Sequence, residues 1–340
     1  MIDLRSDTVT QPTTAMKQAM LEAQLGDDVF QEDPTVIALE HKLATYFGLE
    51  AGIFCPSGTM TNQIAIRLHT HPQSEVICDE KSHIYLYEGG GIAYNSLSSV
   101  RLLSGNRGRI NAQMVADNIN DKHDIHAAVT SMVSLENTVN KGGGCYYDFS
   151  EIEKIGAVCK ANELPLHLDG ARIFNALEAS GDKPVDYGAH FNTISVCLSK
   201  GLGCPVGSVL LGSEKDILRA RRVRKVLGGG IRQAGMLAAA GLYALDHHVE
   251  RLKEDHNRAQ QLGIILQDQR YVESVLAVDS NIVIFRLAND KLAVDFVAKL
   301  QEKDLLAVPF GKHDVRFVTH LDFDDDQLTS AIDLLKSLSF

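Results

Sequence analysis

The chain has 340 residues, of which 45% are hydrophobic and 23% charged, and its formal net charge is -11. This length allows one large core and a smaller second one. The acidic balance argues against binding to nucleic acid or to an anionic membrane surface, and no apolar run approaches the length that spans a membrane. The opening residues 1–7 are too polar for a secretory signal, which predicts a cytoplasmic protein.

The six cysteines, at positions 55, 78, 145, 159, 197 and 204, lie mainly inside apolar runs. None forms a C-x-x-C pair, and none has zinc-ligand spacing with a histidine. We therefore expect reduced, buried thiols and no metal site.

The first elements are two predicted helices, over residues 12–25 and 34–47, each ended by a glycine. A strand over residues 51–56 then enters the turn Ser57-Gly58-Thr59, which opens a further helix. Free backbone N–H groups and a threonine hydroxyl at such a helix start suit a phosphate. The same residues also cap helices, so the turn alone is weak evidence.

Short strand candidates follow at residues 76–78, 99–103 and 127–135, and a capping box at Ser150 to Glu153 predicts a helix that runs to residue 162. Two more apolar strands lie within residues 164–211. Strand and helix alternate from residue 51 to residue 211, which predicts an α/β fold with a mostly parallel sheet covered on both faces. Ligands bind at the carboxyl ends of such strands. Polar clusters follow four of the apolar runs, at residues 57–59, 136–137, 169 and 200.

From residue 214 the chain is predicted to be helical, with an interruption at the glycine-rich residues 228–233 and long helices over 234–245 and 248–267. Strands are then expected at 282–287, 305–308 and 315–319, with helices at 292–301 and 326–338, the last capped by the acidic run 324–326. We expect a large domain over residues 1–250 and a small α+β domain over residues 251–340.

Lys200 stands among apolar residues after the strand that begins near residue 194, and burying a bare ammonium there is costly. It should therefore be neutral, paired or covalently used. Asp169 ends the preceding strand. Pyridoxal 5'-phosphate (PLP) needs an amine to hold its aldehyde and a carboxylate beside its ring nitrogen, so we interpret Lys200 and Asp169 as these two groups. On this pair alone, a solvated lysine and a helix-capping acid explain the pattern equally well.

Motifs along nearly the whole chain favour the PLP interpretation of Lys200 and Asp169. They include Asp3-Leu-Arg-Ser-Asp-Thr-Val-Thr10, Gly26-Asp-Asp-Val29, Glu32-Asp-Pro-Thr35, Pro56-Ser-Gly-Thr59, Leu135-Glu-Asn-Thr138, His167-Leu-Asp-Gly-Ala-Arg-Ile-Phe-Asn175, Cys197-Leu-Ser-Lys-Gly-Leu-Gly203, Pro205-Val-Gly-Ser208, Gly228-Gly-Gly-Ile-Arg-Gln233 and Val318-Thr-His-Leu321. In these residues the chain resembles the L-threonine aldolases, which are PLP-dependent enzymes of the aspartate-aminotransferase-like fold, fold type I.

The resemblance implies a role for each matching residue. Lys200 would form the imine with PLP, Asp169 would bind the pyridine nitrogen, and His83 would lie against the ring. The phosphate would be held by Gly58 and Thr59, with Arg232 from a neighbouring subunit. The substrate carboxylate would be held by Ser6, Arg172 and Arg316, with Arg172 also close to the cofactor. His126 would line the substrate pocket, and either His83 or His126 would take the hydroxyl proton.

Two residues depart from the family pattern. Val139 follows Glu-Asn-Thr where the family commonly has histidine, and Phe30 follows Gly-Asp-Asp-Val where it commonly has tyrosine. Neither belongs to the cofactor set, so the departures affect the expected substrate preference and loop behaviour and leave the PLP prediction in place.

The activity that this resemblance implies is cleavage of L-threonine, L-allo-threonine and related β-hydroxy-α-amino acids to glycine and an aldehyde, as in threonine catabolism and glycine biosynthesis. A site shared between subunits implies a homo-oligomer, at least a dimer and in this family a tetramer. Since one fold supports several reactions, a β-eliminating lyase or a transaminase remains an alternative, as does a non-catalytic protein that binds PLP or amino acids. No nucleic acid or membrane partner is expected.

Overall fold

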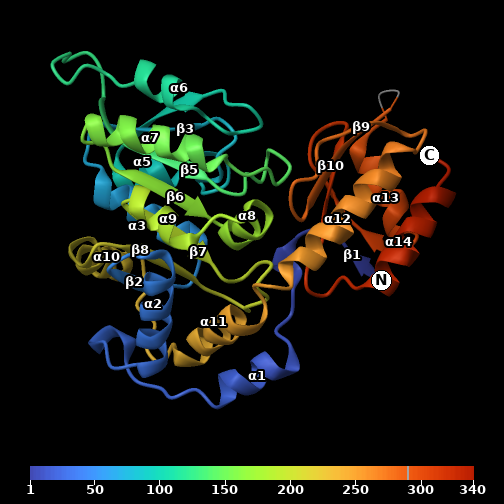
Figure 1. Cartoon of the computed structure of the whole chain (residues 1–340), viewed down its shortest axis with the longest axis horizontal. Coiled ribbons are helices and arrows are strands. Elements are labelled where there is room, and N and C mark those ends of the chain that lie inside the picture. Colours follow the sequence, from blue (N-terminus) through green and yellow to red (C-terminus); the bar gives the residue numbers. More distant parts are fainter. Residues whose placement is uncertain (289–290) are drawn as a thin grey trace.

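The computed structural model describes residues 1–288 and 291–340. Figure 1 shows a larger part built around a seven-stranded sheet and a smaller part, coloured orange to red, that contains both chain termini. No helix within the described residues is both long enough and apolar enough to cross a membrane.

The seven-stranded sheet is almost entirely parallel. Its strand order is β2 (Ala51–Cys55), β8 (Ser208–Gly212), β7 (Thr193–Cys197), β6 (Leu166–Gly170), β5 (Val129–Glu136), β3 (Ser74–Asp79), β4 (Ser99–Leu103). Only β8 runs against its neighbours. The α/β prediction is confirmed. Because β5 and β6 are parallel and Glu136 lies beside Asp169, their carboxyl ends form one edge, which we call the carboxyl edge.

Helices cover both faces of this sheet, so successive residues of a strand are buried in different cores on its two sides. Ile53 and Cys55 face one core, whereas Phe54 between them faces the other. One face packs against α2 (Pro34–Phe47), α7 (Phe149–Ala161), α8 (Ile173–Ser180), α9 (Pro184–His190) and α11 (Gly235–His247), with α1 (Thr14–Leu21) and α6 (Ala112–Asp117) outside them. The other face packs against α3 (Gly58–His69), α4 (His83–Leu86), α5 (Gly91–Ser96) and α10 (Glu214–Val226).

The smaller part has its own antiparallel sheet, in the order β12 (Val308–Pro309), β13 (Asp314–Val318), β10 (Ile282–Leu287), β9 (Val272–Val275). Its core includes side chains of α12 (Leu252–Gln267), α13 (Ala293–Gln301) and α14 (Asp325–Ser337). The N-terminal strand β1 (Ile2–Asp3) pairs with β11 (Leu305–Leu306), and Leu4 joins this smaller core. Two 3-10 helices, η1 (Asp7–Val9) and η2 (Asp28–Phe30), lie in the N-terminal segment.

Several predicted boundaries were wrong. The helix expected to open with a Ser150 capping box begins at Phe149, and Asp148 caps it by accepting the Ser150 N–H. The strand expected over residues 305–308 is divided into β11 and β12, which pair with different partners. The helix expected to start at residue 248 begins at Leu252. The acidic cap of the last helix is confirmed, since Asp324 and Gln327 form a capping box.

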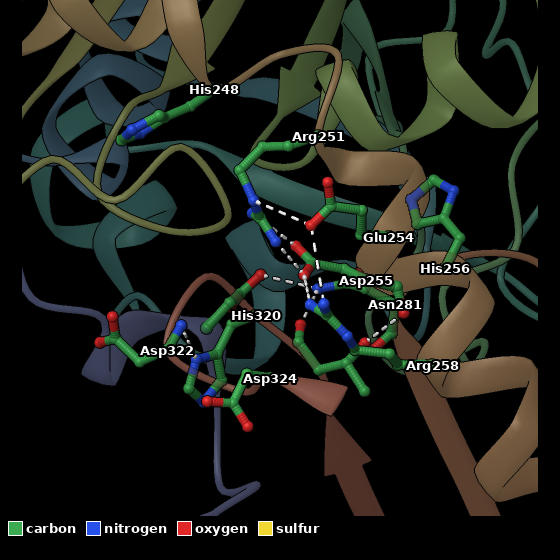
Figure 2. Close-up of polar contacts among 12 residues, drawn as sticks. His248, Arg251, Glu254, Asp255, His256, Arg258, Asn281, His320, Asp322 and Asp324 are labelled. Carbon is green, nitrogen blue, oxygen red and sulfur yellow. Dashed lines mark hydrogen bonds and ion pairs between the residues drawn. The ribbon is translucent and has the colours of Figure 1, made fainter. Parts of the chain in front are cut away.

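A polar cluster ties the start of α12 to β10 and β13 (Figure 2). The buried carboxylate of Asp255 bonds to Arg251 and lies 3.9 Å from Arg258 Nη1. The backbone carbonyl of Asp255 accepts the Thr319 hydroxyl at 2.7 Å. Asn281 donates both to the Thr319 carbonyl at 3.0 Å and to Asp7 Oδ2 at 3.3 Å. Side-chain and backbone hydrogen bonds thus reach from this cluster to Asp7.

Candidate active site

Asp169 lies on β6 at the carboxyl edge, and its side chain is buried. Asn62 Nδ2 donates to its Oδ2 at 2.9 Å, and the Ala171 N–H donates to its Oδ1 at 3.1 Å. Among residues 1–288 and 291–340, no arginine or lysine forms an ion pair with it. Neutral donors hold this carboxylate without cancelling its charge, which leaves it able to stabilise a cation.

Asn62 is oriented by a buried histidine behind it. Asn62 Oδ1 lies 3.1 Å from His167 Nε2. Burial lowers the pKa of His167 to about 4, so the ring is neutral and its Nε2–H donates to Asn62. This bond turns the Asn62 amide NH₂ towards the two carboxylates on its other side, Asp169 and Glu88.

His83 opens α4 beside this pair of carboxylates. Its Nδ1 lies 3.0 Å from Glu88 Oε1, and its backbone N–H donates to Glu136 Oε2 at 2.7 Å. Burial disfavours the charged ring, but the hydrogen bond to Glu88 and the charges of Asp169 and Glu136 outweigh it, so the pKa of His83 is raised. Its side chain is 29% exposed, so the ring reaches the surface of the site.

Glu136 ends β5 and joins two parts of the site. Its Oε2 accepts the His83 N–H, and its Oε1 accepts the Asn140 N–H at 2.9 Å. Burial and the neighbouring Asp169 raise the pKa of Glu136 to about 7, against the opposing effect of these two N–H donors. The Asn140 side chain in turn accepts a bond from Arg316 Nη1 at 2.9 Å.

Two arginines lie close together above this edge. Arg172 is buried, and its Nε and Nη2 each donate to Asp7 at 2.7 Å in a bidentate pair. Burial opposes ionisation of Asp7, but the Arg172 guanidinium and the Lys200 charge lower its pKa to about 2. Burial and the nearby Arg172 charge lower the pKa of Arg316 to about 10. Within the described chain, Arg316 Nε is buried without a hydrogen-bond partner.

Lys200 and Ser6 complete this side of the site. Lys200 follows β7, the strand next to β6, and its carbonyl accepts the Thr10 hydroxyl at 3.2 Å. Its charge helps to lower the pKa of Asp7, the carboxylate that holds Arg172. Ser6 caps η1, and its Oγ accepts the Thr8 N–H at 3.2 Å. The cap therefore fixes the backbone directly before Asp7.

The turn at Gly58 and Thr59 forms the first residues of α3, after the cap Ser57. In the described residues, the N–H groups of Gly58 and Thr59 donate no hydrogen bond. Ser208 Oγ is also buried there without a partner, and it would lie 3.5 Å from a Cβ placed on Gly58. Three unused donors at one helix N-terminus suit an anion.

Two sequence-predicted residues do not join this group within one chain. His126 is exposed and precedes β5, whereas Glu136 ends that strand, so His126 lies at the opposite edge of the sheet. The assignment of His126 to the substrate pocket stays a prediction, and within one chain His126 does not meet the other residues. Arg232 is half-exposed and bonds to Asp27 Oδ2 at 2.9 Å. Its assignment to a neighbouring subunit's phosphate stays a prediction.

The two residues that depart from the family pattern, Val139 and Phe30, lie in different environments. Val139 is buried, and one of its methyl groups would lie 2.5 Å from a Cβ on Gly108. Phe30 is 68% exposed at the end of η2. Residue 139 therefore fills a tight gap, and residue 30 offers an aromatic ring on the surface.

Sequence reasoning missed the residues that hold the site in shape: Asn62, Glu88, Asp7 and Asn140. Asn62 lies within a helix and contacts Asp169 across 107 positions of sequence. Nothing local distinguishes it from an ordinary helical asparagine. Glu136 was noted only as a polar residue after a strand, although its two backbone contacts make it central.

This strand order has one reversed strand, and a lysine follows the strand beside Asp169. These features define the class: the fold is fold type I of the PLP-dependent enzymes. A threonine aldolase from Leishmania major superposes with a TM-score of 0.85 at 19% identity, over 99% of both chains. Serine palmitoyltransferase from Sphingomonas wittichii has a TM-score of 0.77 at 18% identity, over 99% of this chain and 86% of that one.

Sequence comparison is more specific. Residues 3–289 match the beta-eliminating lyase family. The low specificity L-threonine aldolase of Escherichia coli (strain K12) is 41% identical over 330 residues, which cover 96% of each chain. Low-specificity L-threonine aldolase 1 of Arabidopsis thaliana is 38% identical, over 94% of this chain and 91% of the relative. The chain therefore belongs to the beta-eliminating lyase family.

Proposed function

We propose that this protein is a lyase that cleaves L-threonine, L-allo-threonine and related β-hydroxy-α-amino acids to glycine and an aldehyde, with PLP held at Lys200. The observation that carries the proposal is the buried carboxylate of Asp169, which only neutral groups hold. It lies on β6, the strand that pairs with β7, and β7 leads to Lys200. The relatives at about 40% identity bear the name of this activity.

The residues fit PLP at both of its ends. The free N–H groups of Gly58 and Thr59 and the hydroxyl of Ser208 would hold the phosphate, and Asp169 would hold the protonated ring nitrogen. When bound, PLP supplies an electron sink for the pair that is released as the Cα–Cβ bond breaks. The chain itself has to orient that bond and move the hydroxyl proton.

The substrate carboxylate would bind between the two arginines. Arg316 has a buried Nε without a partner among the described residues, which a carboxylate oxygen would satisfy. Asp7 already holds two nitrogens of Arg172, so Arg172 would contribute charge and its remaining Nη1. Ser6 would add a hydroxyl at the same end. In this proposal the amino acid would lie with its carboxylate towards Arg316 and Arg172.

His83 is the group we assign to the hydroxyl proton. Its Nδ1 bonds to Glu88, so Nε2 would take the proton directly or through one bound water. His126 enters this proposal only through another chain of an oligomer. We also propose a homo-oligomer of at least two chains, in which the half-exposed Arg232 reaches a neighbour's phosphate.

The test is incubation of purified protein and PLP with L-threonine and with L-allo-threonine. Glycine and acetaldehyde should form in equal amounts, and the protein should absorb near 420 nm, roughly where PLP imines absorb. A keto acid and ammonia would instead identify the β-elimination that the family name suggests. Lys200→Ala should lose cleavage, whereas the control Lys215→Ala, at an exposed position on α10, should retain it. Cleavage by Lys200→Ala at the wild-type rate would refute the proposal.

A further inference from the structure

Glu88 is a buried carboxylate that accepts a hydrogen bond from His83. It follows α4, and its side chain is fully buried. Oε1 accepts bonds from His83 Nδ1 at 3.0 Å and Asn62 Nδ2 at 2.9 Å, and Oε2 accepts a bond from Gln63 Nε2 at 2.7 Å. Within residues 1–288 and 291–340, it forms no ion pair with an arginine or lysine. A buried charge is costly without a cation, and the His83 imidazole is the one ionisable group bonded to it.

The bond to Glu88 determines which nitrogen of His83 carries the proton. An ionised carboxylate only accepts hydrogen bonds, so Nδ1 must be the N–H that donates. The neutral ring then presents Nε2 as its acceptor, and no protein group among the described residues bonds to Nε2. The backbone bond from His83 to Glu136 fixes the other side of the residue.

Glu88 is also linked to Asp169 through one amide. The Asn62 NH₂ group donates to both carboxylates, at 2.9 Å in each case. His167 orients this amide from behind. His83 and Asp169, which come from different elements, are therefore held in a common frame by Glu88 and Asn62.

We infer that Glu88 is a positioning residue for cleavage: it keeps His83 in the Nδ1–H form with Nε2 towards the substrate, and through Asn62 it aligns His83 with Asp169. In the step it serves, the substrate O–H bond breaks as an N–H bond forms at His83 Nε2. The electron pair left on oxygen becomes part of the aldehyde C=O bond as Cα–Cβ breaks. The pair from the Cα–Cβ bond stays on Cα, where PLP, when bound, would supply the electron sink. This inference rests on the proposed function.

The chemistry of the three partners explains why a carboxylate is needed. His83, Asn62 and Gln63 all donate to Glu88. A glutamine side chain has only one acceptor oxygen, so its NH₂ group would face either Gln63 or the His83 and Asn62 donors. The charged groups around His83 are Glu88 on its own segment, Asp169 on β6 and Glu136 on β5, with the Tyr87 ring 5.5 Å away. Since Glu88 helps to raise the pKa of His83, removing its charge should lower that pKa.

The experiment compares Glu88→Gln with wild-type holoenzyme in the pH dependence of kcat/KM for L-threonine. The variant should keep its absorbance near 420 nm and lose about 10–100-fold in kcat, as is usual when a group behind an active residue is changed. The acidic limb of its profile should move to lower pH, because His83 then loses its proton at lower pH. Glu88→Asp, which keeps the charge, should recover the position of that limb.

Two further variants keep the inference falsifiable. Glu75→Gln, a buried carboxylate bonded to Arg101 at the start of β3, controls for the loss of a buried charge and should leave the profile unchanged. In a His83→Asn background, Glu88→Gln should reduce kcat by less than about twofold, since the two residues act as one unit. An unshifted limb, or equal losses with and without His83, would overturn the inference. If Glu88→Gln does not fold, Glu88→Asp in the wild-type and His83→Asn backgrounds provides the same cycle, with kcat as its readout. Wild-type protein that produces no glycine would instead refute the proposed function.

Discussion

Two clusters of buried carboxylates in this molecule are held in opposite ways. In the cluster of Figure 2, Asp255 is bonded to Arg251 and lies near Arg258, so arginines neutralise its charge. At the carboxyl edge, the Asn62 amide and the Ala171 N–H hold Asp169, and the Asn62 and Gln63 amides hold Glu88 together with the His83 ring. Arginines balance the negative charge in the first cluster, whereas Asp169 keeps a negative charge that a bound cation would balance.

This difference separates a structural role from a functional one better than burial does. The side chains of Asp255 and Asp169 are both almost fully buried, so burial alone does not distinguish them. Removing one partner of a buried ion pair leaves the other charge buried without a partner, and this lowers the free energy of unfolding. Removing a buried charge that no cation balances should change the free energy of unfolding little and should reduce kcat strongly. Substitutions at Asp255, Asp169, Asp7 and Asp324 test this separation.

Asp255→Asn should have the largest effect on the fold. It leaves Arg251 and Arg258 without their buried partner, and such losses cost about 3–5 kcal/mol in free energy of unfolding. Urea unfolding followed by circular dichroism measures this. Glu254→Gln alters an exposed partner of the same arginines and should cost less than about 1 kcal/mol. If the two variants lose nearly equal free energies of unfolding, the buried ion pair of Asp255 stabilises the fold no more than the exposed one of Glu254.

Asp169→Asn should reduce catalysis strongly and leave the stability of the fold almost unchanged. The free energy of unfolding of the cofactor-free protein should stay within about 1 kcal/mol of wild type, because the lost charge had no cation partner. The kcat for threonine cleavage should fall by about 10²–10³-fold, as expected when one charge-stabilising group is removed. The comparison fails if Asp169→Asn unfolds as readily as Asp255→Asn, or if its kcat is unchanged.

Asp7 lies between the two extremes, because an arginine neutralises it and it also lies at the site. Its pKa is lowered from 3.8 to about 2, so the folded state favours the ionised form. The resulting stability is present above pH 3.8 and is lost as pH falls through about 2, and it amounts to about 2 kcal/mol. Urea midpoints at pH 5, 4 and 3 should fall more steeply for wild type than for Asp7→Asn. Parallel pH curves would show that the pair contributes nothing in acid.

Sequence patterns were sufficient for the strand-end residues of the site. Asp169 and Lys200 end apolar runs, and parallel strands bring such ends to one edge, so their proximity follows from local signals. The alternation of strands and helices likewise predicted the sheet, although not the reversal of β8. The five-residue strand β8 carries no mark of its direction, because a strand in a sheet covered on both faces is buried throughout whichever way it runs.

The residues that orient the site could not be predicted in this way. Asn62, Glu88 and Gln63 meet only after α3 and the segment after α4 have packed on the same face of the sheet. Their side chains are polar ones that are ordinary on exposed helices. His126 was named from a family motif alone, and the direction of β5 puts it at the opposite edge of the sheet within one chain, so its role stays a prediction. Asp148 shows that a capping box can be misread when another acid stands two residues earlier.

The smallest predicted effect concerns Asp324, which the acidic run 324–326 predicted as a helix cap. Its Oδ1 accepts the Gln327 N–H at 2.8 Å, and Gln327 Oε1 accepts the Asp324 N–H at 3.2 Å. Asp324→Ala should lower the free energy of unfolding by about 1 kcal/mol and leave kcat unchanged, because this carboxylate satisfies only a helix end. Asp326→Ala, in the first turn of the same helix, removes only a favourable charge near the N-terminus and should cost about 0.3–1 kcal/mol. If the two losses are equal, charge rather than the cap geometry stabilises this end of α14. A fall in kcat would mean that exposed acids of the smaller part reach the site after all, which would remove the distinction between neutralised and unbalanced carboxylates.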